Sequence, residues 1–251
     1  MKSNSLYDFW RQHVDFGFHP KDTDKIREAG DVVIDWTFAE AKKNKKRFSK
    51  EKTLHCKIHK NLFPQPFSGN LNSARVFLLY GNPGFSEEKD YADNYETNNY
   101  VNLCKANLRG KLKGLICLNN KLNVKSGLKS YWLKRFKHLA DDLVAKRIAS
   151  NSEEALSKIE QSVAILEAGA YQSRSSPGGW FFDLPSSRKA RDFARTELLK
   201  RAKQNKCLIL VWRKKDFWDL PDSAKNVIFR KNARLSYLEK EEREQICKWI
   251  R

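Results

Sequence analysis

The residues best suited to chemistry stand directly after four short apolar segments. The apolar segments have the length and composition of buried strands. They span residues 74–80, 162–170, 207–212 and 226–230. Each is followed by polar side chains together with an aromatic residue or an arginine, in the stretches 81–86, 171–174, 213–218 and 231–237. Because ligands of open parallel sheets bind beyond the carboxyl ends of the strands, we expect these four stretches to form one site.

The first stretch begins with Gly81, Asn82, Pro83 and Gly84. Pro83 restricts φ, and the glycines allow a close approach of the backbone. Such a turn can direct the Asn82 amide into a cleft and leave backbone N–H groups free. The alternative is a common Asn-Pro-Gly turn that only redirects the chain.

Helices between the strands must position these residues. The stretch 131–147 has the apolar spacing of an amphipathic helix. Helices are also expected over 186–204, with Ser186 and Ser187 as its caps, and over 238–250. Strands that alternate with helices predict right-handed crossovers. The expected fold is therefore α/β, with three layers (α/β/α) and a central, mostly parallel four-stranded sheet.

The start of the chain is expected to add a helical N-terminal extension over residues 1–63, including a helix over 26–43. The α/β domain would span 64–251, and both parts would pack as one globular unit.

The charge of the chain indicates the class of its partner. The sequence holds 49 Lys and Arg against 30 Asp and Glu, a net charge of +19. Cations on a surface release condensed counterions from phosphates, so nucleic acid is the usual partner of such a protein. Residues 100–150 carry twelve of the basic residues and only two acids, whereas 84–98 is acidic. This acidic stretch is either part of a pocket or a solvated loop.

Two segments resemble the first motif of the uracil-DNA glycosylase superfamily. They are Pro64-Gln-Pro-Phe-Ser-Gly-Asn and, after a spacer, Val76-Phe-Leu-Leu-Tyr-Gly-Asn-Pro-Gly-Phe-Ser. Tyr171-Gln-Ser, Arg213 to Trp218, and Asn232-x-Arg234-x-Ser236 are similar to segments of bacterial uracil-glycosylase-like proteins of unassigned role. The resemblance covers roughly residues 64–240. Two features depart from the family pattern: no residue separates Gly81 from Asn82, and the second motif, His-Pro-Ser, has no counterpart with a histidine.

The resemblance implies a uracil-DNA glycosylase-like fold and a monofunctional DNA glycosylase, which flips a base out of DNA and hydrolyses its N-glycosidic bond. Members that remove glucosylated hydroxymethylcytosine from phage DNA are the nearest functional analogy, which implies antiviral defence. The alternatives are repair of uracil or another damaged base, and a catalytically inactive nucleic-acid-binding protein on the same scaffold.

Single residues can be given roles in such a mechanism. Asn82 would orient the attacking water, as the resemblance implies. Asp90, preferred over Glu87 and Glu88 because Tyr91 follows it, would supply general-base help or negative charge near the sugar. Phe85 or Tyr91 would stack on the base, and Glu167 would accept a hydrogen bond from an amino group such as N4 of cytosine. The expected substrate-binding residues are Gly81, Pro83, Phe85, Tyr91, Glu167, Tyr171, Ser173, Asn232, Arg234 and Ser236. Arg213, Lys214 and Lys215 would bind DNA phosphates.

Three of these residues have simpler alternatives. Phe85 could be a core anchor, Glu167 a charge at a strand edge, and Arg213 a partner in a surface salt bridge. His55-Cys56-x-x-His59 lacks the second pair of ligands that a zinc site needs. The five scattered cysteines suit neither a disulfide framework nor an iron–sulfur cluster. We expect a cytoplasmic monomer without metal, cofactor, secretion signal or membrane span.

Overall fold

A five-stranded sheet forms the centre of the fold, with the strand order β3-β5-β4-β6-β7. The computed structural model describes residues 5–85, 88–96, 98–122, 126–232 and 237–250. The strands are β3 (Phe67–Ser68), β4 (Val76–Tyr80), β5 (Val163–Glu167), β6 (Leu208–Val211) and β7 (Val227–Phe229). β4 to β7 run parallel, and β3 pairs antiparallel with β5.

The four predicted parallel strands are confirmed. The predicted number of strands is wrong, because the sheet has a fifth strand, β3. The missing strand, β3, has only two residues and follows Pro66. A segment this short has no hydrophobic periodicity that a sequence could reveal. The Glu167 N–H donates to the Pro66 carbonyl at 2.9 Å, which extends this edge of the sheet by one more bond.

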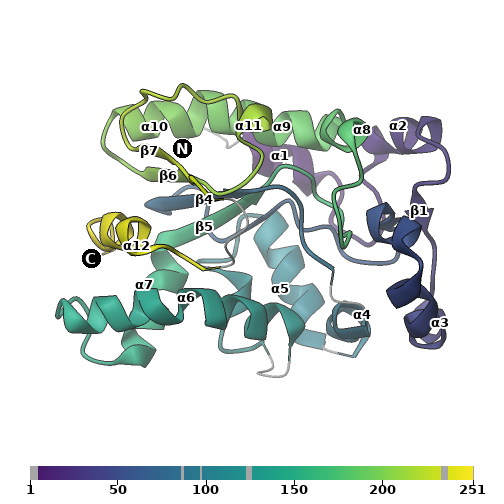
Figure 1. Cartoon of the computed structure of the whole chain (residues 1–251), viewed down its shortest axis with the longest axis horizontal. Coiled ribbons are helices and arrows are strands. Elements are labelled where there is room, and N and C mark those ends of the chain that lie inside the picture. Colours follow the sequence, from purple (N-terminus) through teal and green to yellow (C-terminus); the bar gives the residue numbers. More distant parts are fainter. Residues whose placement is uncertain (1–4, 86–87, 97, 123–125, 233–236, 251) are drawn as a thin grey trace.

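Helices cover both faces of the sheet (Figure 1). Side chains alternate along a strand, so Phe77 and Leu79 enter one core, while Val76, Leu78 and Tyr80 enter the other. The first core is packed by α1 (Ser5–Arg11), α9 (Pro185–Phe193) and α10 (Leu199–Lys203). The second is packed by α6 (Gly127–Ala145), α7 (Ser152–Ser162) and α12 (Lys240–Cys247). Burial on both faces explains why the strands lack alternating polar residues.

The helix expected over 186–204 begins at Pro185 and runs through a π-helical stretch, η4 (Ala194–Leu198), into α10. The prediction that Ser186 and Ser187 cap it is wrong, because both are buried within the first turn. Pro185 takes the first helical position, and Asp22 accepts a hydrogen bond from the Ser186 N–H at 2.9 Å. The cap therefore comes from a distant part of the chain.

The helix expected over 26–43 is also wrong. The chain forms α2 (Thr23–Glu28), then β1 (Val33–Ile34), then α3 (Phe38–Lys50). Gly30, with φ of +81°, follows α2, and a capping box of Thr37 and Glu40 starts α3. β1 pairs parallel with β2 (Ile58–His59) in a separate two-stranded sheet.

The other elements connect these layers. They are η1 (Pro20–Asp22), η2 (Lys52–Cys56), α4 (Glu88–Tyr95), α5 (Asn98–Leu108), η3 (Ile116–Leu118), α8 (Gly179–Phe182) and α11 (Lys215–Trp218). None of the helices within the described ranges combines the length and the apolar character of a bilayer-crossing segment.

Candidate functional site

The loops that follow β4, β5 and β6 touch one another at the carboxyl edge of the sheet. The Gly169 N–H donates to the Gly81 carbonyl at 3.0 Å, and the Ser173 N–H to the Pro83 carbonyl at 3.4 Å. Lys214 packs against Gly81 so closely that a Cβ there would lie 3.3 Å from the lysine Cγ. Three of the four stretches expected to form one site at this edge therefore lie in contact with one another.

The side chain of Asn82 is held by the loop after β5. Its Nδ2 donates to Ser173 Oγ at 2.9 Å, to the Ser173 carbonyl at 3.2 Å and to the Pro83 carbonyl at 3.1 Å. The Ser173 hydroxyl itself donates to the Ser175 carbonyl at 2.8 Å. All three partners of the amide nitrogen are thus acceptors, which fixes the orientation of the amide. Among the described residues, Asn82 Oδ1 accepts no hydrogen bond.

Aromatic residues fill the space beside this loop. The ring of Phe85 stacks on His59, with centroids 3.8 Å apart, and contacts Phe48 edge-on. Tyr91 is fully buried, and its hydroxyl forms a hydrogen bond of 3.0 Å with His59 Nδ1. A cavity of about 10 Å³ lies between Trp36, Phe85 and Tyr91. This space is too small for a base, so the contacts favour the alternative in which Phe85 is a core anchor.

Asp90 lies half-buried on α4, one residue before Tyr91. Its backbone carbonyl accepts a hydrogen bond from Asn94 Nδ2 at 2.7 Å. Burial raises the pKa of Tyr100 in α5, and the nearby charge of Asp90 adds to this increase, so Asp90 lies near α5. Glu87 lies outside the described residues, and nothing is described of the Glu88 side chain.

Glu167 is a buried acid at the carboxyl end of β5. It pairs in register with Tyr80, so both side chains lie on the α6 face of the sheet. Only 8% of Glu167 is exposed, and neither Glu167 Oε2 nor the Tyr80 hydroxyl has a hydrogen-bond partner among the described residues. Burial raises the pKa of Glu167 to about 8, although the positive charge of Arg213 opposes this increase. The carboxyl is therefore mostly protonated at neutral pH.

Tryptophans surround Tyr80, and arginines lie over neighbouring aromatic rings. The ring of Tyr80 contacts Trp132 and Trp212, with centroids 5.3 and 4.9 Å apart. Arg230 lies 3.9 Å over the Trp212 ring and pairs with Glu242 at 3.0 Å. Arg135, from α6, lies 3.1 Å over the ring of Tyr131.

Sequence reasoning missed Tyr80, Tyr131, Arg135 and Arg230. The position of Tyr80 at a strand end could have revealed it. Tyr131 and Arg135 are one helical turn apart, but only the packing of α6 shows which sheet edge they approach.

The expected DNA-binding residues Arg213, Lys214 and Lys215 are exposed. Lys214 has φ of +60°, its Nζ bonds to Ser176 Oγ at 3.3 Å, and it lies 4.4 Å over the ring of Phe182. Lys215 forms an ion pair with Asp222 at 2.7 Å. Among the described residues, no carboxylate forms an ion pair with Arg213 or Lys214.

The other expected residues take different positions. Tyr171 is buried, donates to Asp22 Oδ2 at 2.5 Å and accepts from the His19 N–H at 2.9 Å. It therefore attaches the N-terminal segment to the sheet instead of pointing to Asn82. Asn232 is exposed, and Arg234 and Ser236 lie outside the described residues.

Neither the histidine pair nor the other polar clusters assemble a metal site. His55 Nε2 bonds to the Phe48 carbonyl at 2.9 Å, and His59 is engaged with Tyr91. Within the described part of the chain, no three residues among His, Cys, Asp and Glu are grouped so that they could hold an ion.

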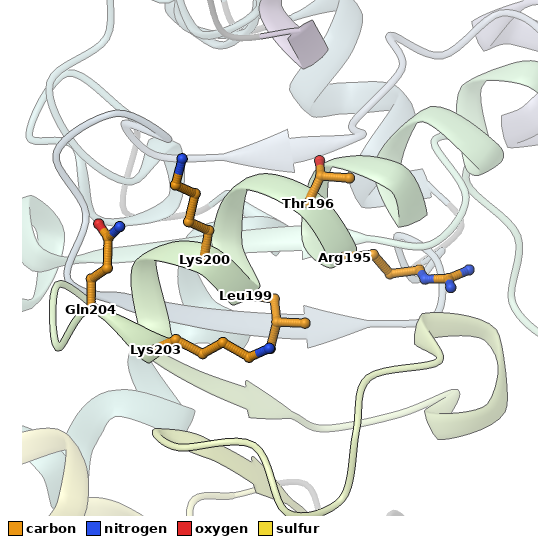
Figure 2. Close-up of a pocket in the computed structure, with 6 residues that line it drawn as sticks. All are labelled: Arg195, Thr196, Leu199, Lys200, Lys203 and Gln204. Atoms are coloured by element: carbon orange, nitrogen blue, oxygen red, sulfur yellow. The ribbon is translucent and has the colours of Figure 1, made fainter.

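A shallow hollow of about 410 Å³ lies elsewhere, on the outer side of η4 and α10 (Figure 2). Its lining residues are Arg195, Thr196, Leu199, Lys200, Lys203 and Gln204. Five of them belong to the continuous helix of η4 and α10, Gln204 is its C-cap, and none of the six is among the residues of the carboxyl edge.

No protein-family model, curated protein or solved structure matches the chain. The resemblance to the uracil-DNA glycosylase superfamily therefore stays a prediction from the sequence motifs.

Proposed function

We propose that this protein is a DNA glycosylase with a uracil-DNA glycosylase-like fold, acting at the carboxyl ends of β4 and β5. One observation carries the proposal. Glu167 is a buried acid whose Oε2 has no hydrogen-bond partner among the described residues, and Asn82 is an amide held in one orientation; the two lie at the ends of adjacent parallel strands. Cleavage of a nucleotide's glycosidic bond needs a positioned water and a group that stabilises the departing base.

Asn82 positions the water in this mechanism. Its nitrogen is held by Ser173, so its carbonyl oxygen can accept a hydrogen bond from a water that attacks C1′ of the sugar. The sugar develops oxocarbenium character as the bond to the base breaks. The electron pair of that bond leaves with the base, and the water adds to C1′ and loses a proton. Asp90 is the proposed acceptor of that proton.

Glu167 recognises the base and stabilises its departure. A protonated carboxyl presents one donor and one acceptor, which complements the ring-nitrogen acceptor and the amino donor of cytosine. The Tyr80 hydroxyl, also buried without a partner among the described residues, offers a further hydrogen bond. We propose a modified cytosine as the substrate, with glucosylated hydroxymethylcytosine of phage DNA as the leading case.

The test compares three DNAs: phage DNA with glucosylated hydroxymethylcytosine, DNA containing uracil, and unmodified DNA. After incubation with the protein, alkali breaks the strand at every abasic site. Breaks confined to the first DNA, and lost with Asn82→Ala, support the proposal. Breaks in uracil DNA alone would overturn the proposed substrate, and an Asn82→Ala variant with full activity would overturn the role of the amide.

A nucleic-acid-binding protein without catalytic activity is the second candidate. The observation that favours it is the tight packing beside the Asn82 loop. The cavity between the aromatic rings there has a volume of only about 10 Å³, which is too small for a base. This candidate predicts tight binding to DNA and no alkali-sensitive sites in any of the three DNAs.

A further inference from the structure

The helix α6 brings an exposed aromatic ring, Tyr131, and a guanidinium, Arg135, to the sheet edge where Tyr80 and Glu167 lie. Tyr131 contacts Trp132 edge-on, with centroids 5.4 Å apart, and Trp132 contacts the Tyr80 ring. Burial raises the pKa of Tyr131, and Glu167 and Arg213 lie near enough for their charges to affect this pKa. Tyr131 and Arg135 therefore belong to the same sheet edge as the proposed site, although they come from a different layer.

Tyr131 is an unusual surface residue because 41% of it is exposed. Its ring is nevertheless held in place: Arg135 covers it at 3.1 Å, and Arg135 also donates to the Tyr131 carbonyl at 3.0 Å. A ring held in this way loses little side-chain entropy when a base stacks on it. The exposed Tyr95 differs, since it stacks with Phe16 and Phe38 and its hydroxyl bonds to the Asn61 carbonyl.

The charge around Tyr131 is positive. Arg135, Arg213 and Arg230 lie close enough to affect one another electrostatically. Glu242 compensates Arg230, which is fully buried. Arg135 and Arg213 form no ion pair with a carboxylate in the part of the chain that the structure describes. Two guanidiniums of the same sign, both uncompensated, repel each other unless an anion lies between them.

We propose that Tyr131, Arg135 and Arg213 bind single-stranded DNA at the sheet edge beside Tyr80 and Glu167. Tyr131 stacks on a base next to the extruded nucleotide, and the two arginines hold the phosphates on either side of that base. Stacking platforms next to cationic grooves are the common way to bind single strands without sequence preference. The inference rests on the proposed function for the extruded nucleotide, but the binding surface itself needs no catalysis.

The test measures the binding of a fluorescent oligothymidylate of about 12 nucleotides, within the usual range of site sizes, by anisotropy at several salt concentrations. Tyr131→Leu is expected to raise the Kd about tenfold or more, and Tyr131→Phe to leave it nearly unchanged. Arg135→Gln and Arg213→Gln should each reduce the slope of log K against log salt by about 0.7, the value for one phosphate contact of a single strand.

Lys200→Gln and Lys203→Gln are the matched controls, because these lysines line the hollow on the opposite face of the sheet (Figure 2). They should not change the Kd or the salt slope by as much as the α6 variants do. If they weaken binding while Tyr131→Leu does not, DNA lies on the α10 face and the inference is wrong. Melting curves identify any variant that binds weakly only because it is unfolded.

The excision assay separates the two proposals. Binding that depends on Tyr131 and Arg135 without excision of any base would support the inference and contradict the glycosylase function. Excision of a base together with a Kd that Tyr131→Leu and Arg135→Gln leave unchanged would support the glycosylase function and contradict the inference.

Discussion

The side-chain nitrogen of Asn82 lies 2.9 Å from the hydroxyl oxygen of Ser173, a residue that follows it by 91 positions. This bond ties the loop after β4 to the loop after β5 and fixes the orientation of the Asn82 amide. Ser173 is fully buried, so its hydroxyl holds the amide instead of contacting solvent. Ser173 is thus the residue that positions the proposed water-binding group.

Ser173→Ala is therefore expected to slow base excision about tenfold or more, because a misplaced catalytic group costs large factors in rate. The effect should fall on kcat and leave KM nearly unchanged, since the serine does not touch the substrate. Single-turnover rates and KM measurements check this expectation. Ser173→Thr, which keeps the hydroxyl, is the control, and a Ser173→Ala variant with the wild-type kcat would contradict the positioning role.

The excision rate should decline as the pH rises through about 8. The folded-state pKa of Glu167 is raised to about 8 by burial, so its carboxyl is protonated below this pH and becomes an acceptor-only carboxylate above it. Glu167→Gln keeps a neutral group with one donor side and one acceptor side. We expect this variant to lose the decline, whatever its absolute rate. A wild-type rate that stays constant well above pH 8 would show that the proton on Glu167 has no role.

His59 should make the protein less stable in acid. Burial lowers the pKa of His59 from 6.5 to about 3, so the folded state favours the neutral ring. The stability that this provides is present above pH 6.5 and is lost as the pH falls from 6.5 towards 3, at up to about 1.4 kcal/mol per pH unit.

His59→Phe keeps an aromatic ring next to Phe85 but cannot take up a proton. In urea unfolding at a series of pH values, its free energy of unfolding should change less steeply than that of the wild type between pH 6.5 and 3. Equal slopes for the two proteins would show that His59 titrates normally in the folded state.

Tyr171→Phe should destabilise the protein by about 1–3 kcal/mol, because it leaves the buried carboxylate of Asp22 without one of its hydrogen bonds. The N-terminal segment should separate first, since Tyr171 also accepts a hydrogen bond from the His19 N–H. Urea unfolding gives the loss in stability, and amide hydrogen exchange over residues 5–28 shows where it occurs. A loss of exchange protection spread evenly over the sheet would contradict this local role.

The sequence by itself determined the four parallel strands and the edge at which polar residues gather, because buried strands flanked by helices have a strong apolar signature. It also determined the large positive charge. Short elements such as β3 escaped prediction, since two residues carry no periodicity. The helix expected over 26–43 failed because Gly30 and the capping box at Thr37 interrupt it.

Only the tertiary structure decided which side chains face one another at that edge. Tyr171 follows a strand in the same way as Asn82, yet it points to Asp22, while Tyr131 and Arg135 reach the site from α6. Strand periodicity fixes the face on which a side chain lies, but the packing of distant layers and the hydrogen bonds between loops fix its direction. The burial that leaves Glu167 protonated at neutral pH likewise arises from residues far apart in the chain.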